Sequence, residues 1–107
     1  MIRSIFIFSF TLLFVSTIFS QQIVPYRKKN KWGYANSKGE VVIKPQYRVA
    51  YPFTTNITAV KKDKNYGFID KAGSPITKFE FIRVSEFYND QASVWTKDTA
   101  YCIDPSG

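Results

Sequence analysis

The chain has 107 residues, with 15 lysines and arginines against eight aspartates and glutamates, and a formal net charge of +7. It contains no histidine, which removes the commonest general base near neutral pH, the commonest metal ligand and every His-containing triad. A single cysteine, Cys102, excludes a disulfide within the chain. The acidic residues form no pair with ligand spacing, and no Gly-rich phosphate loop or nucleophile motif occurs. We therefore expect no enzymatic activity, no metal and no cofactor.

The N-terminus has the layout of a secretory signal peptide. Arg3 gives a short basic start, and residues 5–19 form an uncharged apolar run that is short for a membrane span. A small residue, Ser20, ends the run before a polar segment. The sequence predicts a signal peptide at residues 1–20 and an extracytoplasmic protein, which is periplasmic, secreted or displayed at the cell surface. The alternative is an uncleaved membrane anchor at residues 5–19.

From residue 21 onwards the chain repeats itself with a period of 34 residues. A four-residue segment that opens with Asn or Asp and closes with Gly recurs three times, at residues 36–39, 70–73 and 104–107. A fixed period of this size indicates a repeat architecture. We expect one domain over residues 21–107. It divides into repeat 1 at about 24–57, repeat 2 at about 58–91 and a partial repeat 3 at about 92–107.

Each repeat has the pattern of short strands joined by tight turns. Trp32 and Tyr34 lie two apart, so both rings project from one face of a strand. Gly33 between them leaves the opposite face bare, which often marks a bulge or the close approach of another backbone. Tyr66, Gly67 and Phe68 repeat this pattern. Further strands are predicted at residues 40–43 and 74–77.

The recurring four-residue segments predict type I turns. The first residue can accept a hydrogen bond from a backbone N–H two residues on, and the closing glycine tolerates positive φ. The turn residues are Asn36 and Gly39, Asp70 and Gly73, and Asp104 and Gly107. No segment has helical periodicity. The predicted fold is all-β, with tandem hairpins in an elongated antiparallel meander or solenoid; a β-propeller segment is the alternative.

The motif of the first repeat is the most specific in the chain. Residues 31–39 read Lys-Trp-Gly-Tyr-Ala-Asn-Ser-Lys-Gly, and residues 42–47 read Val-Ile-Lys-Pro-Gln-Tyr. They resemble the WG-containing repeat of bacterial proteins. Residues 66–73 look like a second copy with Tyr for Trp, whereas Ala100-Tyr101-Cys102 replaces the motif in the third. The resemblance implies an extracytoplasmic or binding-type repeat protein.

Basic residues cluster at two equivalent places, just before the Trp-Gly and Tyr-Gly dipeptides. They are Arg27, Lys28, Lys29 and Lys31 in repeat 1, and Lys61, Lys62 and Lys64 in repeat 2. Stacked repeats would place them on one side as a basic ridge flanked by Trp32 and Tyr66. Such a ridge could bind an acidic envelope polysaccharide, an anionic membrane surface or a protein. The alternative is a pair of solvated hairpin turns. The export signal argues against nucleic acid.

Aromatic residues that recur in register are expected in the repeat core. They are Trp32, Tyr34, Tyr47, Phe53, Tyr66, Phe68, Phe81 and Phe87. Rings without such a match are expected at the surface, namely Tyr51, Tyr88, Trp95 and Tyr101. Cys102 aligns with Tyr34 and Phe68, so we expect a small apolar residue at a core position and not a reactive thiol.

Repeat 3 reaches its turn glycine without the strand that follows this turn in repeats 1 and 2. We expect an open C-terminal edge, which either pairs with another chain, including a second copy, or is followed by further repeats. The predicted function is an exported, non-catalytic repeat module that acts as a binding or scaffold surface. One alternative is an accessory region of a longer envelope-modifying enzyme whose catalytic part lies beyond residue 107. Another is a membrane-attached structural protein.

Overall fold

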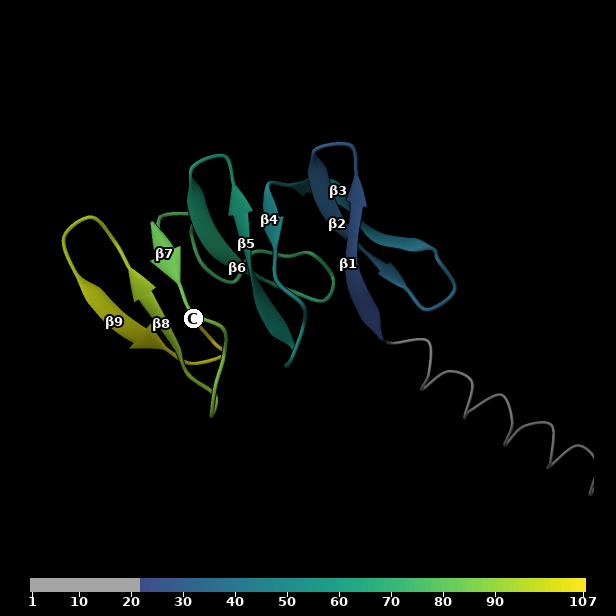
Figure 1. Ribbon diagram of the computed structural model, residues 1–107. Coiled ribbons are helices and arrows are strands. Elements are labelled where there is room, and N and C mark those ends of the chain that lie inside the picture. Colours follow the sequence, from purple (N-terminus) through teal and green to yellow (C-terminus); the bar gives the residue numbers. More distant parts are fainter. Residues whose placement is uncertain (1–21) are drawn as a thin grey trace, which may run out of the picture.

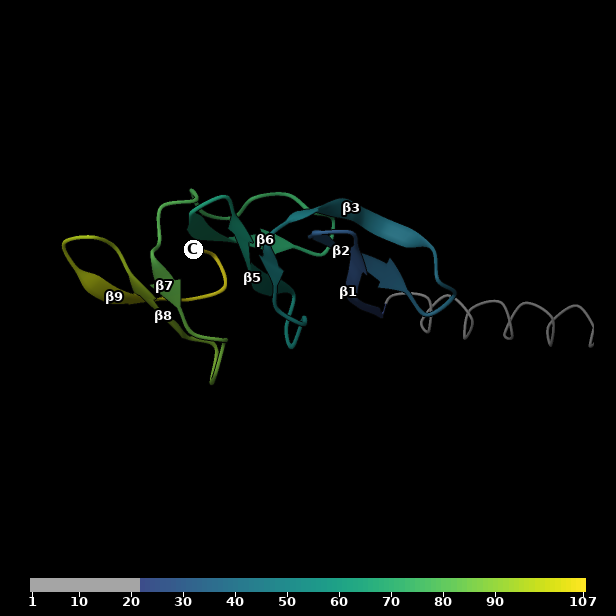
Figure 2. The same cartoon turned by 45° about the horizontal axis from the view of Figure 1, so that its top comes forward.

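Three antiparallel sheets of three strands follow one another along the molecule (Figures 1 and 2). They are seen in a computed structural model that describes residues 22–107, so the predicted signal segment at residues 1–20 lies outside the described residues. The first sheet contains β1 (Ile23–Lys28), β2 (Lys31–Asn36) and β3 (Val41–Tyr47). The second contains β4 (Val49–Ala50), β5 (Ile57–Lys62) and β6 (Asn65–Asp70). The third contains β7 (Arg83–Val84), β8 (Ala92–Trp95) and β9 (Ala100–Ile103). The predicted all-β class is confirmed.

Each sheet contains one hairpin, made of its central strand and one edge strand. The β1–β2 pair runs from Ile23 opposite Asn36 to Lys28 opposite Lys31, and the β5–β6 pair has the same register 34 residues later. Two-residue loops close both hairpins. Their first residues, Lys29 and Asp63, have φ of 58° and 57°, and positive φ at this position suits the right-handed twist of the strands. The three hairpin tips point to the same side of the molecule (Figure 1).

The three predicted turns lie at the opposite ends of these hairpins. The Oδ1 atom of Asn36 accepts from the N–H groups of Lys38 and Glu40, both at 3.0 Å. Asp70 Oδ1 accepts from Ala72 and Ser74 in the same way, at 3.0 and 2.9 Å. The glycines that close the three turns have φ of 84°, 89° and 101°. Since asparagine makes the same two bonds as aspartate, the turn requires an acceptor oxygen and not a charge.

After the turn, a continuous third strand forms only in the first repeat. There, β3 pairs with β2 through register shifts around Tyr34. Gly33 permits this irregularity, because a β-carbon at residue 33 would collide with the carbonyl oxygen of Ile43 and lie 2.7 Å from the carbonyl carbon of Lys44. The close backbone approach expected at this glycine is therefore present.

The prediction of a strand at residues 74–77 is wrong. Only isolated bridges form there, between Ile69 and Pro75 and, further on, between Tyr66 and Phe81. Pro75 has no N–H to donate to a ladder. The N–H of Phe68 donates to the side-chain oxygen of Thr77 at 3.1 Å in place of a backbone carbonyl. The second repeat therefore keeps the path of the third strand but not its regular pairing.

Two hydrophobic clusters connect the sheets, and the second sheet contributes to both. Side chains alternate along a strand, so β5 directs Val60 into one cluster and Ala59 into the other. The first cluster contains Tyr34, Ile43, Tyr47, Val60 and Ile69. The second contains Ala59, Phe68, Phe81, Val84, Ala92, Val94 and Ile103. Each core therefore lies between successive sheets and not within one of them.

Most of the recurring aromatic residues are in these cores, as expected. Four are buried, namely Tyr34, Tyr47, Phe68 and Phe81, while Phe53, Tyr66 and Phe87 pack against the clusters. The Tyr34 and Phe53 rings meet edge to face with centroids 4.9 Å apart, and Phe68 and Phe87 repeat this contact at 5.4 Å. Trp32 is half-buried and belongs to neither cluster.

The rings without a repeat partner divide into two groups. Tyr88 and Tyr101 are exposed as expected, at 79% and 44%. Tyr51 and Trp95 are half-buried, so the prediction of exposed rings is wrong for them. Tyr51 packs against the second cluster because its N–H donates to Ala59 at 3.1 Å. Trp95 lies opposite Arg83 in the strand register, with the guanidinium 4.3 Å from the ring centroid.

Cys102 is exposed, so its predicted core position is also wrong. Its equivalents Tyr34 and Phe68 are covered by Phe53 and Phe87, which follow in the next stretch of chain. In the described chain β9 pairs with β8 alone. The sulfur of Cys102 instead lies 3.9 Å from the hydroxyl oxygen of Ser93, on the face of the third sheet opposite the second cluster.

Candidate functional site

The two basic segments form the tips of the first two hairpins. We call residues 27–31 and 61–65 the basic tips. Their lysines and Arg27 are exposed, apart from the half-buried Lys61. The tips point to one side of the molecule (Figure 1), because both two-residue loops have the same geometry and the hairpins have the same register.

Arg48, which the sequence analysis did not single out, lies between the basic tips. It is the one residue that separates β3 from β4, and its N–H donates to the carbonyl of Lys61 at 2.8 Å. A recess of about 380 Å³ is lined here by Asn30, Lys31, Arg48 and Asp63. Residues of both tips and of the connecting chain therefore meet at one place. The repeat pattern could not indicate this, because the equivalent of Arg48 is Ile82.

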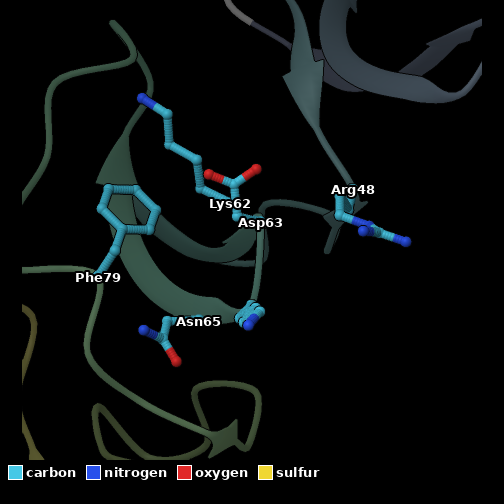
Figure 3. Close-up of a pocket in the computed structure, with 6 residues that line it drawn as sticks. Arg48, Lys62, Asp63, Asn65 and Phe79 are labelled. Atoms are coloured by element: carbon cyan, nitrogen blue, oxygen red, sulfur yellow. The ribbon is translucent and has the colours of Figure 1, made fainter.

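A second recess, of about 650 Å³, continues around the second tip. It is lined by Arg48, Lys62, Asp63, Lys64, Asn65 and Phe79. Figure 3 shows Lys62 and Phe79 on one side of the tip and Arg48 on the other. Arg48 and Asp63 line both recesses, so the two adjoin at these residues. We call the combined surface the cationic groove.

The Phe79 ring forms the apolar part of the cationic groove. It covers Gly67, where a β-carbon would lie 2.8 Å from the ring. The amine of Lys62 lies 5.9 Å from the ring centroid. Phe79 is thus held by the glycine of the Tyr-Gly dipeptide, so the repeat motif itself positions this side of the groove.

The groove is lined mainly by charged and amide side chains. Lys31, Arg48, Lys62 and Lys64 supply cations, Asp63 a carboxylate, and Asn30 and Asn65 amides. Within residues 22–107 there is no group of three or more His, Cys, Asp or Glu side chains that could hold a metal ion. The part of the chain that the structure describes has no helix long and apolar enough to cross a membrane.

The tyrosines whose pKa is raised pack in or against the core clusters and do not line the groove. Burial raises the pKa of Tyr34 well above its ordinary value, and the nearby Tyr47 adds to the increase. The Tyr34 hydroxyl donates to the carbonyl of Tyr51 at 2.6 Å, so its proton is engaged in a structural bond. Burial likewise raises the pKa of Tyr47 and of Tyr51. The shifts of Tyr34 and Tyr47 reflect packing between the first two sheets, whereas Tyr51 packs against the second cluster.

The predicted flanking rings lie beside the basic tips in different ways. Lys61 places its amine 5.4 Å from the centroid of the Tyr66 ring. Trp32 lies opposite Arg27 in the β1–β2 register. The third tip has Trp95 at the position of Arg27 and Lys61. The basic surface therefore belongs to the first two repeats.

The repeat is also recognised at the level of the protein family. A sequence model of the WG containing repeat matches residues 32–66 and again residues 66–94, which together make up more than half of the chain. Searches among curated proteins and among solved structures found no match. The matched residues include the Trp-Gly dipeptide at the β2–β3 bulge and the turns at residues 36–39 and 70–73. The chain therefore belongs to the family of WG-containing repeat proteins.

Proposed function

We propose that this protein is a non-catalytic binding module whose cationic groove and basic tips hold an anionic partner. The observation that carries the proposal is the position of Arg48, which connects two basic hairpin tips into one surface. If the basic segments were only solvated hairpin turns, no residue would need to connect them. Exposed cations brought together in this way raise the local concentration of anionic groups and speed their association.

A charge-removal experiment tests this function. Changing Lys28, Lys29, Lys61 and Lys62 to Ser should weaken binding of the full chain to anionic polysaccharide or anionic vesicles. The loss should shrink as salt rises, because exposed charges are screened beyond about 8 Å at physiological ionic strength. Binding can be measured by co-sedimentation over a salt series.

The matched control removes the same charge elsewhere. Lys38, Lys44, Lys71 and Lys78 are exposed and lie outside the basic tips. Changing these four to Ser should leave most of the binding intact. Equal losses in the two quadruple variants would mean that net charge alone drives binding. A wild-type chain that ignores anionic surfaces even at low salt would leave the solvated-turn interpretation.

We also propose that the repeats form an elongated array and not part of a propeller. Each sheet has three strands, whereas a propeller blade usually has four. In addition, β3 and β4 are separated by one residue, so a nearly continuous stretch of chain passes from one sheet into the next. The shared stretch supports stacking in a row.

We propose that residues 1–20 are a signal peptide that directs export and is removed, which leaves Gln21 as the mature N-terminus. Export would place the groove outside the cytoplasm. The intact mass of the protein isolated from its native envelope tests this proposal. A mass that retains the apolar segment would indicate a membrane anchor instead.

A further inference from the structure

We propose that the occupant of the cationic groove is a chain of an acidic polysaccharide that carries carboxylate groups. This inference rests on the proposed function and narrows it to one class of partner. It follows from three properties of the groove, which are its open shape, the carboxylate at its centre and the absence of large apolar side chains at the tips.

The shape of the groove suits a polymer. Recesses of about 380 and 650 Å³ meet at Arg48 and Asp63, and both are open to solvent. Sites for small molecules usually bury most of the ligand in an apolar cavity. An extended chain instead gains affinity by making several shallow contacts along its length. The two adjoining recesses around the second tip offer such contacts, from Asn30 and Lys31 in one to Phe79 in the other.

The chemistry of the groove favours sugar carboxylates over phosphates. Asp63 lies among four cations and lines both recesses. An aspartate repels every anion, so it is unfavourable in a site built only for phosphate. Sugar hydroxyls, however, donate hydrogen bonds that a carboxylate accepts. Arg48 can bind a sugar carboxylate through two parallel N–H groups, and Phe79 offers an apolar ring for the C–H face of a sugar.

The groove is poorly suited to a lipid surface. The basic tips, residues 27–31 and 61–65, include none of the large exposed apolar side chains of the described part. Segments that lie in a membrane interface combine basic residues with apolar side chains that enter the acyl boundary.

Replacing Asp63 by Asn distinguishes a sugar from a simple anion. Asp63 has φ of 57°, a conformation that asparagine adopts readily, so the hairpin should keep its fold. The change removes a negative charge and a strong acceptor. It should therefore strengthen binding to polyphosphate and to vesicles containing phosphatidylglycerol. Binding to polygalacturonate should instead weaken by about tenfold, because the charged hydrogen bond to a sugar hydroxyl is lost.

Arg48→Ser provides the second variant, with Lys38→Ser as its charge-matched control. Arg48→Ser should weaken binding to polygalacturonate by about tenfold, whereas Lys38→Ser should leave it within about twofold because Lys38 lies at the opposite turn. Dissociation constants of the full chain for polygalacturonate, methyl-esterified polygalacturonate, polyphosphate and phosphatidylglycerol vesicles, measured at one salt concentration, supply all comparisons. The esterified polymer should bind weakly, since it lacks the carboxylates.

Several outcomes would overturn the inference. If Asp63→Asn strengthens binding to polygalacturonate as it does to polyphosphate, the groove is a simple anion surface. In that case the proposed binding function stands and the polysaccharide assignment fails. Wild-type binding to vesicles that is tighter than binding to polygalacturonate would assign the surface to membranes. Failure to bind any of the anionic probes at low salt would overturn both proposals.

Discussion

The acceptor oxygen at the start of each turn is the smallest unit that recurs in this chain. Asn36 and Asp70 each accept two backbone N–H groups at 2.9–3.0 Å, although only Asp70 carries a charge. The closing Gly73 has φ of 89°. At residue scale the turn therefore depends on an oxygen atom and on a left-handed conformation.

We predict that Asp70→Asn changes the free energy of unfolding by less than about 0.5 kcal/mol. Gly73→Val should cost about 1 kcal/mol or more, because a branched side chain is forced into positive φ. A β-carbon at residue 73 would make only ordinary contact with Ile43, at 3.5 Å, so the cost is conformational and not steric. Denaturant midpoints of the two variants provide the measurement.

Gly39→Val is the matched control for this prediction. Gly39 has φ of 84°, and a β-carbon there would have no neighbour within 4 Å. Its replacement should therefore cost about as much as that of Gly73. Equal midpoints for Asp70→Asn and Gly73→Val would show that the turn does not depend on the glycine.

At the scale of elements, the sequence predicted the hairpins correctly. It predicted the strand that follows each turn only in part. The Trp32 and Tyr34 alternation and the recurring turns depend on near neighbours in the chain, and these features appear as predicted. The path of residues 74–81 depends on Pro75, which removes a donor, and on Phe79, which covers Gly67. Those effects arise from contacts across the fold, so the repeat pattern alone overestimated the regularity of this strand.

The groove could likewise be predicted only in part, because its residue Arg48 was missed. The basic segments were visible as charge clusters at equivalent positions, and their position at hairpin tips follows from the repeat. Arg48 breaks the period, because Ile82 occupies the equivalent position. Its place between the tips results from the bond of its N–H to Lys61 in the next sheet. A side chain positioned by contacts between repeats carries no signal within a single repeat.

At the scale of the whole molecule, each sheet depends on its neighbours for cover. The second sheet has a hydrophobic cluster on each side, whereas the third contributes Ala92, Val94 and Ile103 to one cluster only. The outer face of the third sheet carries Cys102 beside Ser93, where the second sheet has Phe68 beside Ala59. This is the behaviour expected of a repeat array, in which stability arises largely at interfaces between adjacent units.

The edge of β9 leads to a prediction for which the equivalent residues of β6 provide an internal control. In β6 the N–H groups of Tyr66 and Phe68 point away from β5 and donate to Phe81 and Thr77, at 2.7 and 3.1 Å. By the repeat register, Ala100 and Cys102 direct their N–H groups to the corresponding edge of β9, which borders no further strand in the described chain. A backbone N–H without a strand partner is exposed to solvent and is a template for pairing.

We therefore expect the amides of Ala100 and Cys102 to exchange with deuterium at least about tenfold faster than those of Tyr66 and Phe68, because edge groups exchange without unfolding of the sheet. Residue-resolved exchange of the dilute full chain measures this difference. Tyr66 and Phe68 serve as internal controls, since they occupy the same positions of the repeat. Exchange of the β9 amides that slows as protein concentration rises would reveal self-association through this edge. Protection of Ala100 and Cys102 equal to that of the controls at every concentration would contradict the open edge, because some part of the same chain would then have to cover it.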